Sequence, residues 1–481
     1  MTDDGVRAEN GERVQRKNMF WMVALMAGLA ACVTGCASAT REPAMVSPVD
    51  ATQFGAVGDG VTLNTASLQR IIDKCSAQGG GIVRLAAGRF LTGTIQLKDN
   101  ITLQLDEKAV LLGSTKAADY RNVDPFIDGS GHEMGYALVA AVGARNVGID
   151  GPGTIDGQGK ALSQAQSTYT IRPFLVRWVR CTDVTVKDAT LLNSGAWGMN
   201  FFQCTNVTAG GLTIRNRSGL ANNDGIDIDS CQHVSISGCD IDSGDDALCL
   251  KTTSTQPCRD VTAGDCKLKT NCNAIKMGTE SIGDFEHIRM SQCQIRQTGM
   301  AGVAVYSVDG SILHDVTISD LTMDTIAVPI SVRLGSRLKT FRPGDTAKPV
   351  GAIRDVTIKN VNAVGVKQIG MLINGIPGHA VQSLSFENIN IELAGGGSAE
   401  DAKVQLAEQE SAYPEVSTFG KVMPAYGMYA RHVDGVSFKN VQMSLAKADA
   451  RPAAVVLDVK GMDPADFAAN LNPRQIPATM P

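Results

Sequence analysis

The segment Cys181-Thr-Asp-Val184 is one copy of a short motif that recurs through most of the chain and decides its fold. In each copy an apolar residue is followed by two further residues and then by Val, Ile or Leu. Successive copies start 23, 27, 27, 27, 28, 40, 28 and 52 residues apart. A nearly constant period over many copies indicates stacked structural units and not separate domains. The later copies begin at Cys204, Cys231, Cys258, Phe285, Leu313, Ile353, Val381 and Val433.

Each copy contains short runs in which apolar and polar residues alternate, such as Val184-Thr185-Val186 and Val316-Thr317-Ile318. Alternation over this length predicts a β-strand. Several short strands per unit are typical of a single-stranded right-handed parallel β-helix, in which each coil pairs with the coils above and below. The sequence therefore predicts an all-β fold, with the β-helix over residues 49–460 and a tail over 461–481.

A helix is expected before the first coils. Leu68, Ile71 and Ile72 recur at the spacing of one helix face, and Asn64 is a suitable N-cap. Such a short amphipathic helix would cover the open end of the stack, where strand edges and apolar side chains would otherwise meet water.

The chain has 12 cysteines, a number that suggests disulfides in an exported protein. Their positions indicate otherwise, because Cys shares repeat slots with Leu, Ile, Phe and Val and so behaves as a small apolar residue. We expect core ladders and not disulfides. The sequence contains no Cys-x-x-Cys pair, so a metal site at the cysteines is not expected either. Besides the motif starts, a second such column comprises Leu212, Cys239, Cys266, Cys293 and Leu321.

The N-terminal residues resemble a targeting segment. Arg13, Arg16 and Lys17 form a basic region before the apolar run 19–31. That run is too short to span a membrane and has the length of a signal-peptide core.

Two cysteines after this run, Cys32 and Cys36, resemble the lipidated residue of a bacterial lipobox. We favour Cys36 because a tether rich in Ser, Ala, Thr and Pro follows it directly. We expect a signal over 1–36, a tether over 37–48, and export to the periplasm or outer membrane of a bacterium as a lipoprotein. A plain secretory signal is the alternative.

Two long steps in the repeat mark insertions, at 335–350 and at about 395–424. Long loops on a rigid stack often border a binding groove. For the second, a disordered surface excursion is the alternative. Net charge is -5 and no dense Lys/Arg block occurs, so a nucleic-acid partner is not expected.

Acidic residues gather at equivalent places on two neighbouring coils. Asn222-Asn-Asp224-Gly225 leads into one strand, and Gly244-Asp245-Asp246 leads into the next. Aligning the strands puts Asp224 over Asp246, and neighbouring coils are about 4.8 Å apart. Crowded carboxylates raise at least one pKa, which suits a general acid. Aspartates that cap turns, or a calcium site, are the alternatives.

These motifs resemble glycoside hydrolase family 28, the polygalacturonase and rhamnogalacturonase-like family of pectin lyase-like β-helices. Ile155-Asp-Gly-Gln-Gly159 and Asn193-Ser194 with Trp197 are also similar. The resemblance implies inversion without a metal or other cofactor. It implies Asp245 as the general acid, with Asp224 and Asp246 holding and activating the attacking water.

Two departures from the family pattern concern substrate recognition. Asn273 stands where polygalacturonases have the His of Gly-His-Gly, and Ala304-Val305-Tyr306 stands where they have Arg-x-Lys. Other residues must then bind the sugar, among them a Lys near the acid and an Arg for a uronate carboxylate. The substrate-binding candidates are Asn222, Lys251, Lys276, Glu280, Tyr306 and Arg333, with Arg337 and Trp197 as further possibilities.

The sequence thus favours hydrolysis of an α-linked, pectic or rhamnogalacturonan-like polysaccharide by a monomer that meets a membrane only through a lipid anchor. For Lys276, a surface ion pair with Asp227 is the alternative to a role in the site. A β-helical polysaccharide lyase with a Lys or Tyr base is one rival function. A non-catalytic, glycan-binding β-helix is the other.

Overall fold

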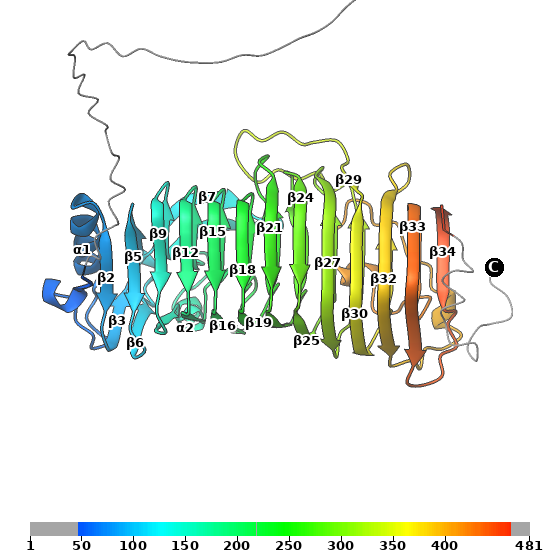
Figure 1. Ribbon diagram of the computed structural model, residues 1–481, viewed down its shortest axis with the longest axis horizontal. Coiled ribbons are helices and arrows are strands. Elements are labelled where there is room, and N and C mark those ends of the chain that lie inside the picture. The colour runs from blue at the N-terminus through cyan, green and yellow to red at the C-terminus, as the bar shows by residue number, and fades with distance from the viewer. Residues whose placement is uncertain (1–46, 218, 463–481) are drawn as a thin grey trace, which may run out of the picture. The chain divides into compact units, whose positions relative to one another are not determined.

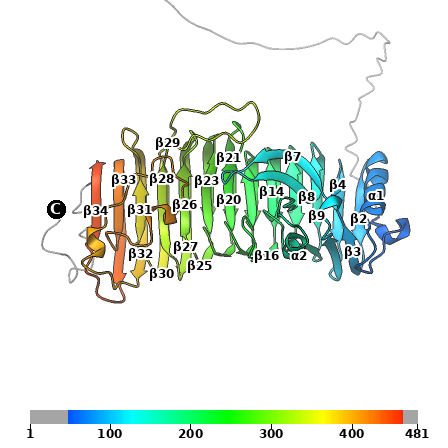
Figure 2. The same cartoon turned by 180° about the vertical axis from the view of Figure 1, so that it is seen from behind.

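The computed structural model describes residues 47–217 and 219–462, and its strands wind into a parallel β-helix (Figure 1). The 34 strands join in one hydrogen-bonded sheet, in which all pairings but one between named strands are parallel. Each coil contributes short strands to three ladders that run the length of the β-helix, visible from both sides in Figures 1 and 2. The stacked units predicted from the repeat are therefore present.

The first ladder contains the repeat motif itself. Val184 pairs with Val207, and that valine with Val234 on the next coil. Its strands are β1 (Val49–Asp50), β2 (Gly81–Leu85), β5 (Ile101–Leu105), β9 (Arg145–Asp150), β12 (Thr182–Lys187), β15 (Thr205–Gly210), β18 (Gln232–Ser237), β21 (Cys258–Gly264), β24 (Phe285–Ser291), β27 (Ile312–Asp324), β29 (Ala352–Ile353), β30 (Val356–Val366), β32 (Val381–Leu393) and β33 (Met428–Leu445).

The second ladder follows on each coil, and the later strands β27, β30, β32 and β33 continue into it. Its shorter strands are β3 (Gly88–Thr92), β6 (Ala109–Gly113), β10 (Thr154–Asp156), β13 (Thr190–Leu192), β16 (Thr213–Asn216), β19 (Asp240–Ser243), β22 (Lys267–Thr270) and β25 (Gln294–Thr298).

The third ladder carries the candidate site. β7 (Arg121–Ile127) pairs antiparallel with β8 as a hairpin outside it. The strands of the third ladder are β4 (Ile95–Leu97), β8 (Glu133–Val142), β11 (Phe174–Val179), β14 (Met199–Phe202), β17 (Ile226–Asp229), β20 (Leu248–Thr252), β23 (Ile275–Ser281), β26 (Ala301–Ser307), β28 (Val328–Leu334), β31 (Met371–Asn374), the start of β33, and β34 (Ala454–Lys460).

The repeat motif contains its own turn. Its third residue has a left-handed backbone, with φ of 57° at Asp183, 57° at Asn206 and 56° at His233. Asn, Asp and His tolerate this region better than other residues with a Cβ. This backbone requirement explains why the third residue of the motif is polar while its first and fourth residues are apolar.

The cysteines of the two predicted columns lie inside the β-helix, as predicted. The ten in the described residues are free and buried, and both predicted columns belong to one continuous apolar core. Cys258 pairs in register with Phe285, and that residue with Leu313, so Cys takes the place of larger apolar side chains. Burial of such columns is the main stabilising term of this fold.

The predicted capping helix is present as α1 (Thr65–Ala77), whose Leu68, Ile71 and Ile72 are fully buried at the first coil. Asn64 takes the predicted N-cap position, but its side chain does not cap the helix. The side chain instead holds the loop before the helix, accepting from the Val57 backbone N at 2.7 Å. The remaining helical segments are α2 (Gly159–Gln164), η1 (Ala51–Phe54), η2 (Ala117–Asp119), η3 (Asp401–Lys403) and η4 (Val416–Phe419).

Within residues 47–217 and 219–462 we find no helix with the length and hydropathy needed to cross a membrane. The predicted signal, the lipidation site Cys36 and most of the tether lie outside the described residues, as does most of the predicted tail.

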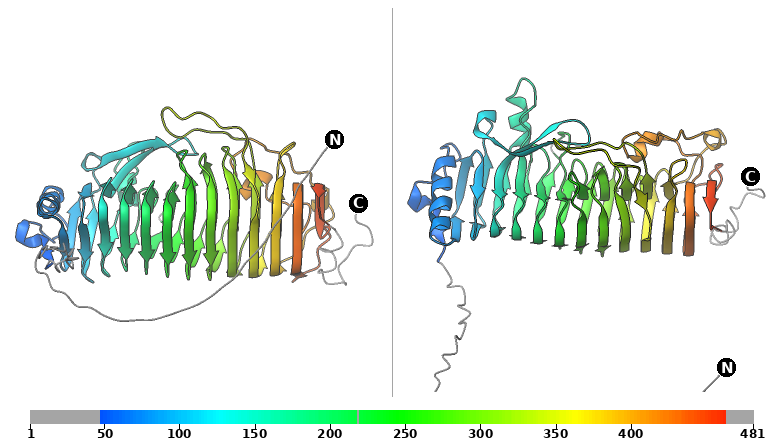
Figure 3. Two further views of the ribbon diagram at one scale, coloured as in Figure 1. Left: turned by 45° about the horizontal axis from the view of Figure 1, so that its top comes forward. Right: turned by 90° about the horizontal axis from the view of Figure 1, so that it is seen from above.

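The two insertions and the β7–β8 hairpin lie along the same side of the β-helix (Figure 3). The Ile127 backbone N of the hairpin donates to the Phe341 carbonyl of the first insertion at 3.0 Å. The Ser336 backbone N donates to the Glu410 carbonyl of the second insertion at 2.7 Å. We call these three segments the wall. They cover the outer face of the third ladder, so the second insertion is not a free excursion.

Candidate active site

The candidate site lies where the chain enters three consecutive strands of the third ladder. Asp224 precedes β17, Asp246 precedes β20 and Asn273 precedes β23. Ile226 pairs with Leu248, and Leu248 with Ile275, so the coil alignment predicted from the sequence is the one observed. The Gly225 backbone N donates to the Asp246 carbonyl at 2.9 Å, which fixes the two acidic loops directly above one another.

Asp245 and Asp246 differ in their surroundings. Asp245 is half-buried, and burial together with the charge of Asp246 raises its pKa. Asp246 is 2% exposed. Burial alone would raise its pKa too, but Lys276 and Lys251, with hydrogen bonds from Lys276 and Asn273, hold it at about 2. The environment therefore favours one protonated and one ionised carboxyl group side by side.

Asp224 and Asp227 share one buried cation. Lys251 Nζ lies 3.8 Å from Asp224 Oδ2 and 3.7 Å from Asp227 Oδ1. Burial, followed by the charges of neighbouring aspartates, raises the pKa of Asp224 well above its ordinary value. Lys251 also lies over the Trp197 ring, 4.5 Å from its centroid. Lys251 pairs in register with Asp229 in the sheet, but its ammonium group lies near Asp224 and Asp227.

A closed ring of side-chain contacts, which we call the Lys276 ring, joins Lys276, Glu415, Asn273 and Asp246. Lys276 Nζ is 2.9 Å from Asp246 Oδ2 and 2.5 Å from Glu415 Oε1. Asn273 Nδ2 donates to Asp246 Oδ1 at 2.8 Å and lies 3.0 Å from Glu415 Oε2. Lys276 is therefore not paired with Asp227, because its buried ammonium group lies between two nearer carboxylates.

Glu280 connects the cluster to the wall. Its Oε2 accepts from Lys251 Nζ at 3.1 Å, and its Oε1 accepts from the Gly129 backbone N in the β7–β8 turn at 2.7 Å. Burial would raise the pKa of Glu280, but Lys251 and Arg337 lower it. Glu280 is thus an ionised anchor for the hairpin, and it is 2% exposed.

Tyr306 and Arg333 do not present free groups to a sugar, contrary to the expectation from sequence. Tyr306 is 1% exposed and its hydroxyl donates to Ser331 Oγ at 3.0 Å. Arg333 donates to the Gln409 carbonyl at 2.5 Å and packs over the Phe419 ring. Both residues hold the second insertion, whose apolar side chains cover this end of the third ladder.

The remaining candidates also have protein partners. Asn222 is half-buried beside the acid loop, where its Oδ1 accepts from Arg172 at 2.7 Å and its backbone N donates to Asp245 Oδ2 at 3.3 Å. Arg337 forms a two-pronged ion pair with Asp309. Trp197 packs between aromatic rings and is 1% exposed, so it is a core residue.

One outward column of the third ladder carries buried polar groups on three successive coils. Arg177 pairs with Asn200, and Asn200 with Asp227. All three are at most 1% exposed. Both side-chain atoms of Asn200 and both carboxylate oxygens of Asp227 have no hydrogen-bond partner in the described structure, and neither has Arg177 Nε. Buried polar atoms are usually satisfied, so this column points to hydroxyl-rich molecules, water or sugar, bound against it.

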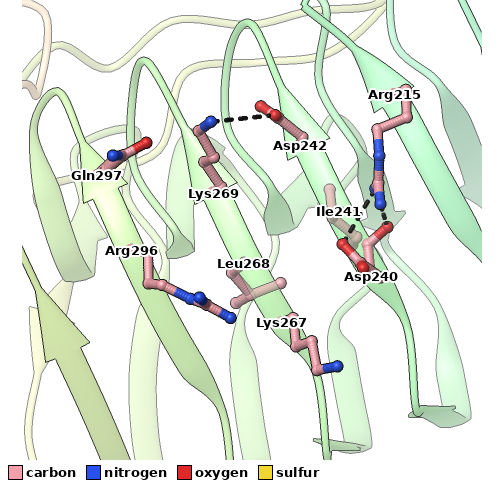
Figure 4. A pocket seen from close by; sticks show the side chains of 9 residues that line it. All are labelled: Arg215, Asp240, Ile241, Asp242, Lys267, Leu268, Lys269, Arg296 and Gln297. Atoms are coloured by element: carbon pink, nitrogen blue, oxygen red, sulfur yellow. Dashed lines mark hydrogen bonds and ion pairs between the residues drawn. The ribbon is translucent and has the colours of Figure 1, made fainter.

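A separate pocket opens on the second ladder, lined by charged residues including Arg215, Asp240, Lys267 and Lys269 (Figure 4). Its cations are partly neutralised, since Arg215 Nη1 lies 3.0 Å from Asp240 Oδ1 and Lys269 Nζ lies 3.5 Å from Asp242 Oδ2. None of the acidic site residues lines it, so we place the chemistry at the carboxylates and not at this pocket.

The described residues contain one group whose spacing suits a metal ion, formed by Asp245, Asp246 and Cys272. Asp246 already accepts from Lys276 and from Asn273 through both of its oxygens. A buried ammonium group so close occupies the electrostatic role of a bound cation, so these residues fit a metal poorly.

A family model described as glycosyl hydrolases family 28 matches residues 75–412. The chain belongs to this family. It is therefore a glycosidase. A probable polygalacturonase from Vitis vinifera is 28% identical over 372 residues, which cover 71% of this chain and 73% of that protein.

Two solved structures show the same fold. The exopolygalacturonase of Thermotoga maritima has a TM-score of 0.66 and 21% identity, covering 84% of this chain and 93% of that one. A family 28 exopolygalacturonase of Yersinia enterocolitica has a TM-score of 0.66 and 20% identity, covering 86% and 78%. The predicted right-handed parallel β-helix is confirmed.

Sequence reasoning missed the part that the wall plays in this family 28 site. Glu415 lies in the second insertion, outside the repeat, so no coil alignment could place it. Asn200 and Arg177 could have been found, because they share a column with Asp227, one coil and two coils away respectively. Asn273 was treated as a lost histidine, although its amide contacts Asp246 directly.

Proposed function

We propose that this family 28 protein hydrolyses an α-linked, uronate-containing pectic chain by a single inverting displacement. Asp245 is the general acid, Asp246 is the base, and Asp224 holds the attacking water. The observation that carries this proposal is that the surroundings of the adjacent Asp245 and Asp246 shift their pKa values in opposite directions, upward for Asp245 and downward for Asp246. Inverting hydrolysis needs one protonated and one ionised carboxyl group on opposite sides of the bond that breaks.

Asp224 has the secondary role because its pKa is raised by burial and by Asp227 and Asp245. A protonated carboxyl group can orient a water by hydrogen bonding, but it accepts a proton poorly. Asp246, which Lys276 keeps ionised, is the stronger candidate for taking the proton from that water.

The pectic substrate is supported by the relatives, which include a probable polygalacturonase and two exopolygalacturonases. The wall supports action at a chain end. Asp224 and Asp246 are each 2% exposed, while Asp245 keeps contact with solvent. A site covered along one side admits the terminal units of an oligosaccharide more easily than the middle of a long polymer. A rhamnogalacturonan-like chain is the alternative substrate within this class.

The lyase alternative loses its base candidates. A lyase needs a side chain that can remove a carbon-bound proton, and Lys276 is held between Asp246 and Glu415. Tyr306 is buried, with a pKa raised by burial and by Glu415. Neither group offers a free basic atom to a substrate. The glycan-binding alternative gives no reason for burying several carboxylates close together around two lysines, at a cost in desolvation.

We also propose export through the N-terminal segment, with lipidation at Cys36 and action as a monomer at the bacterial envelope. The basic and apolar regions and the cysteine after them support this. Mass spectrometry of the N-terminal peptide from the membrane fraction tests it. An unmodified Cys36 in a secreted product would contradict the anchor.

The function is tested by measuring reducing-sugar release from polygalacturonate, trigalacturonate and rhamnogalacturonan, with proton NMR of the first-formed anomer. We expect release of the terminal unit with inverted configuration. Asp245→Asn should lower turnover by about a hundredfold to ten-thousandfold, as for loss of a general acid. Product absorbance near 235 nm (the signature of an unsaturated lyase product), or undiminished release by the variant, would overturn the proposal.

A further inference from the structure

The second insertion brings a carboxylate into the site that the coils themselves do not supply. Glu415 comes from the segment between β32 and β33, and it lies 142 residues after Asn273 in the sequence. It is 6% exposed. Both of its oxygens face donors, since Oε1 contacts Lys276 Nζ and Oε2 contacts Asn273 Nδ2.

We propose that Glu415 is a positioning residue that acts through Lys276 and Asn273 to hold Asp246 in place as the base. This inference rests on the proposed role of Asp246. Lys276 and Asn273 are the two side chains that bind the oxygens of Asp246, one on each. Glu415 contacts the same two groups from the opposite side, so each is fixed between two carboxylates.

The contacts of the Lys276 ring explain why a carboxylate is needed at this place. Asn273 Oδ1 accepts from the Ala301 backbone N at 3.0 Å, which fixes the amide so that its Nδ2 faces Asp246 and Glu415. Lys276 and Asn273 therefore both present donors to Glu415. A carboxylate accepts from both, whereas a glutamine would point an NH₂ group at one of them.

The ring also links catalysis to the wall. Glu415 immediately precedes η4, whose Val416 and Phe419 are buried against Tyr306 and Tyr429. Arg333 holds the same insertion through the Gln409 and Tyr413 carbonyls. Docking of the insertion therefore completes the surroundings of Asp246. Glu415 holds Asn273, the residue that stands where the family has its histidine.

Several ionisable groups face the two carboxylates. Around Glu415 they are Lys276 of β23, Asp246, Cys272, Tyr306 of β26, Arg333 of β28 and Tyr413 of the insertion. Around Asp246 they are Lys276, Lys251 of β20, Glu415, Asp245, Asp224, Asp227, Cys249 and Cys272. Removing Lys276 would raise the pKa of Asp246, and removing the negative charge of Glu415 would lower it.

The test is a double-mutant cycle on the full chain, using trigalacturonate as the probe. Glu415→Gln should lower kcat by about ten- to a hundredfold with KM changed by less than threefold, because misplacing a reacting group costs about this much. Lys276→Gln should move the acidic limb of kcat/KM to higher pH. Adding Glu415→Gln to that variant should move the acidic limb back toward lower pH by about half a pH unit or more. It should lower kcat little further, because both substitutions act on the same ring. Glu410→Gln, at an exposed carboxylate of the same insertion, should leave all of these unchanged.

The outcomes separate this inference from the proposed function. If Glu415 only docks the insertion, the losses of kcat from the two substitutions will add. The acidic limb of kcat/KM in the double variant will then stay where it is in Lys276→Gln, and the inference is overturned. If Asp245→Asn keeps wild-type activity, the proposed function fails instead. Should Glu415→Gln unfold, the double variant and Lys276→Gln alone still decide the matter, because an unmoved limb in Lys276→Gln excludes control of Asp246 through the ring.

Discussion

Asp245 and Asp246 are adjacent in the chain, yet their surroundings shift their pKa values in opposite directions. Asp245 is half-buried and its pKa is raised by burial and by Asp246. Asp246 is buried deeper but contacts Lys276 Nζ at 2.9 Å, and its pKa is about 2. The backbone between them turns one carboxyl group toward solvent and the other toward two buried cations.

This difference predicts the pH dependence of hydrolysis. Asp245 must be protonated to act as the acid, so kcat/KM should be high below its raised pKa and fall as pH rises through it. Asp246 must be ionised, so the acidic limb should lie near pH 2. Initial rates on trigalacturonate across a pH series measure both limbs. Activity that increases from weakly acidic to alkaline pH would contradict the assignment of Asp245.

Removing the charge of Glu280 should loosen the hairpin. Glu280→Gln leaves Lys251 buried with one partner fewer and weakens the bond to the Gly129 backbone N. Breaking a buried ion pair from one side costs about 3 kcal/mol. Urea unfolding should show this loss, and limited proteolysis should show faster cleavage in the β7–β8 hairpin. Glu392→Gln, at an exposed position of β32, is the control and should change neither. Equal stability of both variants would mean that the hairpin is held by other contacts.

The cysteine ladders predict stability without disulfides. The ten cysteines in the described residues are free, and those of the two predicted columns lie in the apolar core. We expect the Tm of the folded protein to be the same with and without a thiol reductant, as measured by circular dichroism. A fall in Tm on reduction would show that a cross-link contributes to the fold.

The sequence predicted the architecture well because the fold repeats. Each coil must place an apolar residue inward at the same place, so the register of Val184 on Val207 and of Ile226 on Leu248 follows from spacing alone. The same register brought Asp224 and Asp246 together. Local rules were less reliable, since Asn64 precedes a helix but uses its amide elsewhere.

The wall could not be predicted in this way. The contacts of Glu415 and Arg333 depend on where an insertion folds back, and no period fixes that path. Arg333 was expected to hold a substrate carboxylate, but backbone carbonyls of the insertion already accept from it. A buried Arg is as useful for holding a loop as for binding a ligand, and only the three-dimensional arrangement distinguishes these roles.

The outward column of Arg177, Asn200 and Asp227 makes a final prediction, in which protein stability and substrate affinity change in opposite directions. Asn200 is 1% exposed and neither polar atom of its side chain has a hydrogen-bond partner among the described residues, so Asn200→Leu removes unsatisfied groups at nearly constant volume. Stability to urea should rise by about 1 kcal/mol. If sugar hydroxyls bind this column, KM for trigalacturonate should rise about tenfold, because a lost hydrogen bond is worth about that factor.

Asn374→Leu is the matched control for Asn200→Leu. Asn374 lies in β31 and is 2% exposed, and within the part of the chain that the structure describes its two polar side-chain atoms also lack hydrogen-bond partners. It lies in register with Arg333, away from Asp227 and the acidic loops. The control should share the gain in stability and leave KM unchanged. An unchanged KM in both variants would mean that the Arg177–Asn200–Asp227 column binds only water, and that the sugar contacts the carboxylates from another direction.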